Sequence, residues 1–177
     1  TLTASENLSI TGGSLTVGDH FSDNSSFAVG TTLTVSGGSF GGDGSIDVLG
    51  DFAWTGGSLS GIGLLDLTSA TSVAIGGAGN PVLNGLLVVT TDAINLASGS
   101  LTIQSGGLFL TGVSGLTVQN GATFNLQGGS VTSTNGVSVA GDLNLSGGSL
   151  SAGGIMSVAA NGVVTISGDT VVSATST

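Results

Sequence analysis

The amino-acid sequence predicts an all-β fold, a single parallel β-helix (β-solenoid) that occupies residues 1–177 as one domain. Three observations predict it: short apolar–polar–apolar triplets, Gly-containing turns between them, and a nearly regular spacing of the triplets. The 34 glycines disfavour long helices, because each Gly in a helix interior costs about 1 kcal/mol relative to Ala. Hydrophobic residues make up 39% of the chain, which is enough to bury a core despite the high Gly and Ser content.

Each triplet has the period-2 alternation of a half-buried strand. The first one, Leu8-Ser9-Ile10, is followed by the turn Thr11-Gly12-Gly13-Ser14, where Gly tolerates the positive φ of a sharp corner. The same pattern recurs in Leu33-Thr34-Val35, Phe52-Ala53-Trp54, Val73-Ala74-Ile75, Ile94-Asn95-Leu96, Phe124-Asn125-Leu126, Leu143-Asn144-Leu145 and Val164-Thr165-Ile166.

The triplets end at positions 10, 35, 54, 75, 96, 126, 145 and 166, with two intervals, the first and the fifth, longer than the rest. About three strand pieces fit into one interval, and each piece is too small to bury its own face. Stacking them in parallel, about 4.8 Å apart, buries them in one continuous core. This predicts about eight coils of 19–21 residues, and the variable coil length favours a right-handed solenoid. Irregular coils are expected near 18–30, 76–85 and 97–123, the last reflecting either an added hairpin or a shift of register.

The segment Gly50–Leu67 returns in the second half of the chain as Gly141–Val158, with its glycines kept and its apolar residues exchanged for one another. We interpret the segment as one coil, in which Gly56-Gly57 turns a corner. Its apolar residues and their counterparts in the second copy are predicted to form the core: Phe52, Trp54, Leu59, Leu65, Leu67, Leu143, Leu145, Leu150, Met156 and Val158.

Two stretches, Asp51–Gly61 and Gly136–Gly153, resemble a motif of large secreted bacterial β-solenoid proteins. These are the filamentous-haemagglutinin-like adhesins and the autotransporter passenger repeats. The resemblance implies a non-enzymatic rod, extracellular or on the cell surface, that displays or anchors something.

The charge balance excludes several partners. The chain has no Lys or Arg against ten Asp plus Glu, a formal net charge of −10, so nucleic acid and anionic membrane surfaces would repel it. It also lacks an apolar run long enough to span a bilayer, and we expect no membrane insertion. The absence of Cys excludes a disulfide framework and thiolate metal sites.

Four acidic residues form a candidate calcium site. Asp47 and Asp66 occupy the same frame one predicted coil apart, and Asp43 and Asp51 are close to Asp47 in sequence. Calcium binds several such carboxylate oxygens. The alternative interpretation is a solvated acidic face, and no other cofactor is expected.

No set of residues indicates catalysis. We find no paired general acid and base and no phosphate cradle, and His20, the one His, has no nucleophilic Ser in a suitable setting. We therefore expect that the protein is not an enzyme.

Both ends of the chain have the pattern of further strands, without Lys or Pro to protect the open sheet edges. The residues concerned are Thr1, Leu2 and Thr3 at one end and Val171, Val172, Ser173 and Ala174 at the other. Either the chain is a slice of a longer solenoid, or copies stack end to end in a heterologous, non-closing contact. The second explanation predicts a structural subunit of an extracellular filament or matrix, a head-to-tail homopolymer. The alternative is the stalk or display segment of a large surface adhesin, with cell-surface or matrix glycans as partners.

Overall fold

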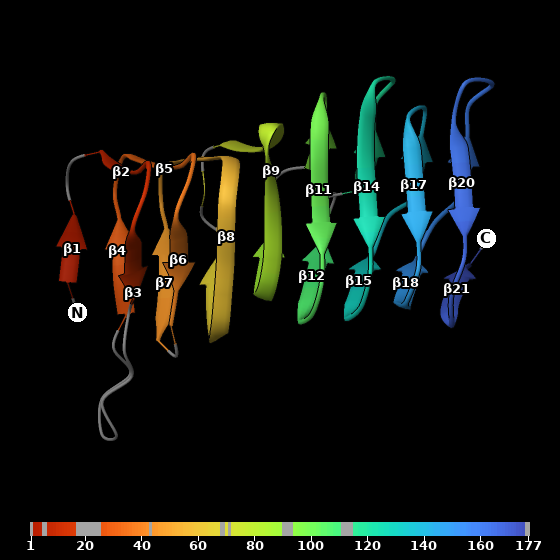
Figure 1. Cartoon of the computed structure of the whole chain (residues 1–177). Coiled ribbons are helices and arrows are strands. Elements are labelled where there is room, and N and C mark those ends of the chain that lie inside the picture. Colours follow the sequence, from red (N-terminus) through yellow and green to blue (C-terminus); the bar gives the residue numbers. More distant parts are fainter. Residues whose placement is uncertain are drawn as a thin grey trace.

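The computed structural model of the chain describes residues 2–4, 7–16, 26–42, 44–67, 70, 72–89, 94–110 and 115–175. These residues form strands and turns with no helix, and every strand pairing recorded among them is parallel. The predicted all-β parallel solenoid is therefore confirmed. Figure 1 shows the strands stacked along one axis, with the N- and C-termini at opposite ends of the rod. The handedness and the number of coils stay predictions.

The strands are β1 (Leu2–Ala4), β2 (Leu8–Ile10), β3 (Ser14–Thr16), β4 (Ser26–Val29), β5 (Thr32–Val35), β6 (Ser39–Gly41), β7 (Ser45–Val48), β8 (Asp51–Asp66), β9 (Ser72–Val89), β10 (Ile94–Leu96), β11 (Gly99–Ile103), β12 (Gly107–Leu110), β13 (Leu116–Val118), β14 (Ala122–Leu126), β15 (Ser130–Ser133), β16 (Val137–Val139), β17 (Asp142–Leu145), β18 (Gly148–Ala152), β19 (Met156–Val158), β20 (Val163–Ile166) and β21 (Thr170–Ala174).

Consecutive pairings join these strands into long ladders, which we name by their first strand. The β1 ladder runs β1–β4–β7–β8–β9–β12–β15–β18–β21. The β3 ladder runs β3–β6–β8–β9–β11–β14–β17–β20. The β2 ladder runs β2–β5–β8–β9. A separate ladder, the β10 ladder, runs β10–β13–β16–β19. In the second half of the chain, the strands of the β10 ladder lie between those of the β1 and β3 ladders in sequence, as the β2-ladder strands do in the first half. The long strands β8 and β9 bend around the rod, so they contribute to several ladders.

The registers explain the long interval between Leu96 and Leu126 in the sequence. Leu96 does not pair with Leu126, because its partner is Val118 in the next strand of the β10 ladder. Leu126 pairs instead with Ile103, in the preceding coil of the β3 ladder. The long interval is therefore a change of ladder within a series of ordinary coils. Of the two explanations for the irregularity near 97–123, the shift of register is correct and the added hairpin is wrong for the residues described there.

The segment 76–85, predicted as an irregular loop, lies inside β9. Its irregularity remains visible in the backbone, because Gly76 and Asn80 have positive φ angles of 115° and 50°. The pairing of β9 with β8 also shifts register on both sides of Gly56 and again between Ser60 and Leu64. Most of the remaining predicted irregular segment, 18–30, lies outside the described residues. Its described part contains β4.

The inward residues of all ladders form a single core along the rod. Eight of the ten residues predicted as core are buried: Phe52, Trp54, Leu59, Leu65, Leu67, Leu143, Leu145 and Leu150. Met156 packs against the core while only partly buried. The tenth residue, Val158, is considered with the end of the rod below.

Glycines with positive φ turn the corners between strands. Gly13, Gly38 and Gly57 follow the β2 ladder, with φ between 71° and 81°. Gly106, Gly129 and Gly148 do the same after the β3 ladder, with φ between 73° and 82°. Backbone from the preceding coil lies so close to most of these glycines that a Cβ atom would collide with it. The coils therefore stack at backbone contact, which only Gly permits here.

The two copies of the repeated segment lie on different ladders. Trp54 belongs to the β2 ladder, whereas Leu145, its counterpart in the sequence repeat, pairs with Leu126 and Ile166 on the β3 ladder. The repeated string therefore specifies a strand and the corner after it, and it does not specify one face of the rod.

Candidate functional site

The four residues of the candidate calcium site are only partly brought together. Asp47 and Asp66 are register partners on the β1 ladder, as the sequence predicted. Asp51 begins β8 and pairs with Thr32 and Ser72 on the β2 ladder. Asp43 lies outside the described residues. Within the described part of the chain, no group of three or more His, Asp or Glu residues could hold a metal ion, and calcium binding stays a prediction.

The residues predicted as an end-to-end interface lie at the two open edges of the solenoid. At the N-terminal end, Leu2 and Thr3 belong to β1, which pairs with β4 on one side, while Thr1 lies outside the described residues. At the C-terminal end, β21 carries Val171, Val172, Ser173 and Ala174 and pairs with β18 on one side. The strands at the two ends thus belong to the same β1 ladder.

The C-terminal end of the rod carries an exposed apolar surface. We define the terminal face as the exposed large apolar residues of the last strands and the turn before them: Ile155, Val158, Val163, Ile166, Val171 and Val172. Among the residues whose side chains the structure describes, Leu49 is the one other exposed large apolar residue. The exposure is therefore concentrated where the ladders end.

The terminal face includes residues that occupy core positions. Val158 pairs with Val139, and Ile166 pairs with Leu145. Val139 and Leu145 are completely buried, whereas 50% of Val158 and 58% of Ile166 are exposed. The prediction of Val158 as a core residue is therefore wrong for this chain alone. Its side chain has the core register, but no later coil of the described residues covers it.

Four residues of the terminal face were missed by the interface prediction, which named only the last strand at this end: Val158, which was predicted as core, and Ile155, Val163 and Ile166. Ile155, Val163 and Ile166 are 71%, 51% and 58% exposed. The signal for Ile166 was present in the sequence, since Val164-Thr165-Ile166 is the last triplet of the series. The end of a solenoid is a whole coil, so all strands of the last coil contribute to it.

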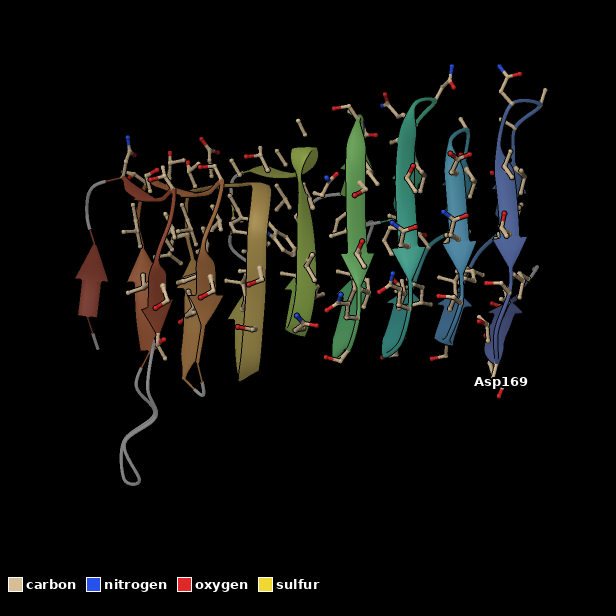
Figure 2. All side chains as sticks on the ribbon, viewed as in Figure 1. Asp169 is labelled. Atoms are coloured by element: carbon tan, nitrogen blue, oxygen red, sulfur yellow. The ribbon has the colours of Figure 1, made fainter. Side chains whose placement is uncertain are left out.

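Little charge accompanies this apolar surface. The only acidic residue between Met156 and Thr175 is Asp169, which lies in the turn between β20 and β21. Figure 2 shows its side chain pointing away from the body of the rod. The terminal face itself is therefore uncharged.

Side-chain hydrogen bonds also connect successive coils on the outside of the rod. The Asn144 amide donates to Asn125 Oδ1 at 3.0 Å, and the Asn125 amide donates to Thr102 Oγ1 at 3.3 Å. On the β10 ladder, Gln119 Nε2 donates to Asn95 Oδ1 at 2.8 Å. These polar contacts satisfy one another, so they fix the stacking and do not mark a ligand site.

Comparison with known proteins adds no family to this picture. No protein-family model matches the chain, and neither the curated proteins nor the solved structures contain a significant match. None of the described residues forms a helix long and apolar enough to cross a membrane.

Proposed function

We propose that this protein is a structural subunit of an extracellular filament or matrix, whose copies stack end to end through their open solenoid edges. The observation that carries the proposal is the exposure of Val158 and Ile166, whose register partners in the preceding coil, Val139 and Leu145, are buried. A further coil on this end would bury the exposed pair in the same way. The extracellular location is supported by the resemblance of the repeated segment to secreted solenoid proteins.

Apolar burial supplies the driving force for this stacking. Complete burial of one Val or Ile side chain contributes about 1.5–3 kcal/mol, so each half-exposed member of the terminal face would contribute roughly half of that. New backbone hydrogen bonds along the edge strands would add to it. Natural solenoids cap such edges with a polar repeat or a charged strand, and the last strands of this chain contain neither Lys nor Pro.

The net charge of −10 opposes the association of copies, because the chain has no Lys or Arg to neutralise it. The repulsion acts between exposed charges, so salt at about 0.15 M, where the Debye length is about 8 Å, largely screens it. We expect assembly to be slow at low ionic strength and to accelerate on addition of NaCl.

The test is assembly of the purified chain, followed by light scattering over a concentration series and by electron microscopy. We expect fibres whose width is constant and whose length grows with protein concentration. The substitution Ile166→Asp places a charge in the terminal face and is expected to abolish the fibres. Leu49→Asp is the matched control, because Leu49 is also about half exposed, at 49%, but lies away from the end. It is expected to assemble normally.

A wild-type chain that stays monomeric at high concentration would contradict the filament proposal. It would leave the stalk or display segment of a larger adhesin as the better explanation. Fibres that survive Ile166→Asp but not Leu49→Asp would show that lateral contacts, and not the terminal face, hold the copies together.

A further inference from the structure

We infer that the terminal face receives the N-terminal edge of a second copy, head to tail, in the register that continues the ladders. In this arrangement β2 of the incoming copy stacks on β19, and β3 stacks on β20. The inference rests on the proposed function and adds the polarity of the contact and the residues that meet in it.

The backbone hydrogen bonds at one corner of the rod have a fixed direction. The N–H group that follows each β10-ladder strand donates to the last carbonyl of the strand one coil earlier. Gln119 donates to Leu96 at 2.9 Å, Ala140 to Val118 at 2.7 Å and Ala159 to Val139 at 2.8 Å. The next acceptor in this series is the Val158 carbonyl, so this carbonyl faces the open end.

A second corner repeats the pattern. Gln127 donates to Ile103 at 2.8 Å, Ser146 to Leu126 at 2.8 Å and Ser167 to Leu145 at 2.9 Å. The next acceptor here is the Ile166 carbonyl. At both corners the terminal face therefore presents carbonyl oxygens beside its exposed Val158 and Ile166 side chains.

The N-terminal edge presents the complementary group. The Ser36 N–H donates to the Ile10 carbonyl at 2.9 Å, in the same direction as at the other corners. Ile10 and Val35 are register partners, so Thr11 is the first-coil equivalent of Ser36. Its N–H faces away from the second coil and fits the Val158 carbonyl of another copy. Two terminal faces placed together end to end would run their strands antiparallel, whereas the strand pairings recorded among the described residues are parallel. We therefore infer a heterologous contact, which generates an open polymer.

The side chains match in the same register. Inside the rod, Ile166 would meet Leu15, and Val158 would lie over Ile10, which is already buried in the free chain at 6% exposure. Leu15 and Leu8 are only partly buried in the free chain, so they retain apolar surface for the contact. Outside the rod, Ser157 would meet Ser9, which gives hydroxyl against hydroxyl. The described residues 7–16 contain no acidic side chain, so β2 and β3 bring no like charge to the terminal face.

This register makes β1 and β21 compete for one place on the β1 ladder. In the contact, β2 and β3 of the incoming copy complete the coil that β21 of the first copy begins. The strand β1 of the incoming copy would occupy the position of β21, because each of them would lie next to β4 of the incoming copy. The strand β21 has 5 residues and pairs with β18 along its whole length, whereas β1 has 3 residues and pairs with β4. We therefore expect β21 to keep its place and β1 to leave β4 when copies join.

The chain has no Cys, which makes cysteine crosslinking a direct test. The pair Ser9→Cys and Ser157→Cys places two exposed thiols about 4.8 Å apart, the spacing of adjacent strands, only when a second copy docks in this register. Within one copy, β2 and β19 belong to opposite ends of the rod (Figure 1). Assembled protein treated with a short bis-maleimide reagent is therefore expected to give a ladder of covalent multimers on a denaturing gel.

Two controls separate the register from assembly itself. The pair Ser9→Cys and Thr165→Cys has the same exposure but lies on two different ladders, and it is expected to stay monomeric on the gel. The single variant Ser157→Cys would give covalent dimers only if terminal faces meet each other, and it is also expected to stay monomeric.

The competition between β1 and β21 gives a kinetic test in the full chain. Proline within a strand disrupts its pairing, so Thr3→Pro weakens β1 against β4 and is expected to accelerate fibre growth measured by light scattering. Ser173→Pro makes the same change in the competing strand β21 and is expected to slow growth. Unchanged or slower growth of the Thr3→Pro variant would overturn this register.

The outcomes distinguish the two proposals. If the wild-type chain forms fibres but the matched pair gives no multimers, or the off-register pair or the single variant crosslinks as well as the matched pair, this inference is overturned and the filament proposal stands. If the wild-type chain forms no fibres, the filament proposal fails and the inference fails with it.

Discussion

Gly57 lies directly against the carbonyl oxygen of Gly38 in the preceding coil, and a Cβ atom on Gly57 would come within 2.6 Å of that oxygen. The φ angle of Gly57 is also positive, at 81°. An L-residue in this conformation costs roughly 1–2 kcal/mol, and the collision adds a displacement of backbone. We therefore expect Gly57→Ala to destabilise the protein by more than about 2 kcal/mol, measured as a loss of thermal midpoint by circular dichroism.

Gly13 is the matched control for this substitution. It occupies the equivalent corner nearer the N-terminal end, its φ angle is 73°, and a Cβ atom there would meet nothing within 4 Å. Gly13→Ala should cost only the conformational part, roughly 1–2 kcal/mol. Equal losses for the two variants would show that stacking at backbone contact does not limit the corner.

The indole N–H of Trp54 is buried without a hydrogen-bond partner. A buried donor without an acceptor costs about 1–3 kcal/mol, so removal of this group offsets part of the packing lost with the larger ring. We expect Trp54→Phe to lie within about 2 kcal/mol of the wild type, whereas Trp54→Ala should lose about 3–5 kcal/mol through the cavity it creates. Chemical denaturation followed by circular dichroism measures both variants. A Trp54→Phe variant as unstable as Trp54→Ala would mean that the indole nitrogen has an acceptor.

Asp47 and Asp66 occupy paired positions on neighbouring strands, where like charges destabilise a sheet. Asp47→Asn is expected to raise the thermal midpoint at low ionic strength by an amount equivalent to roughly 0.5–1 kcal/mol, and NaCl should remove the difference. Asp142→Asn is the control, because Asp142 pairs with Thr123 and Val163 and should show no gain.

The same pair of variants tests the calcium hypothesis. A cation site at Asp47 predicts that CaCl2 raises the thermal midpoint of the wild type more than MgCl2 does at equal concentration. It also predicts that Asp47→Asn lowers this gain while Asp142→Asn keeps it. Equal effects of both salts on all three proteins would leave a solvated acidic face as the explanation of these residues.

Asn125 connects three coils, because its amide donates to Thr102 and its carbonyl oxygen accepts from Asn144. Asn125→Ala removes both hydrogen bonds, each of which contributes about 0.5–1.5 kcal/mol. Asn95→Ala removes one hydrogen bond, with Gln119, at an exposed position and should cost less. Thermal unfolding of the two variants checks the order, and a smaller loss for Asn125→Ala would contradict the structural role of the amide ladder.

The sequence pattern predicted the fold class and most of the core because alternation and Gly corners are local properties of the chain. The side chains of Phe52, Trp54 and Leu143 point into the core because apolar and polar residues alternate in their triplets, and this alternation is also what made the triplets recognisable. The assignment of strands to ladders is not local, and it failed between Leu96 and Leu126. Triplets on two different ladders have the same pattern, and only the pairing of whole coils tells them apart.

The candidate sites were harder to predict for a different reason. The register of Asp47 with Asp66 followed from their spacing in the sequence, which equals one coil. The exposure of Val158 and Ile166 could not be read from their own triplets, which are typical of buried strands. It depends on whether another coil lies above them, and no local pattern carries that information.

The register of the β1 ladder also affects how the length of this molecule can vary. Val131 and Leu150 are partners one coil apart, and Val131 stacks on Leu108. If residues 131–149 were removed, Leu150 would take the place of Val131 against Leu108, and the strands after it would fall onto the ladders of the coil below. Loss or gain of a whole coil thus changes the length of the rod while each new contact still joins two residues of the same ladder, so the length is free to change while the cross-section stays constant.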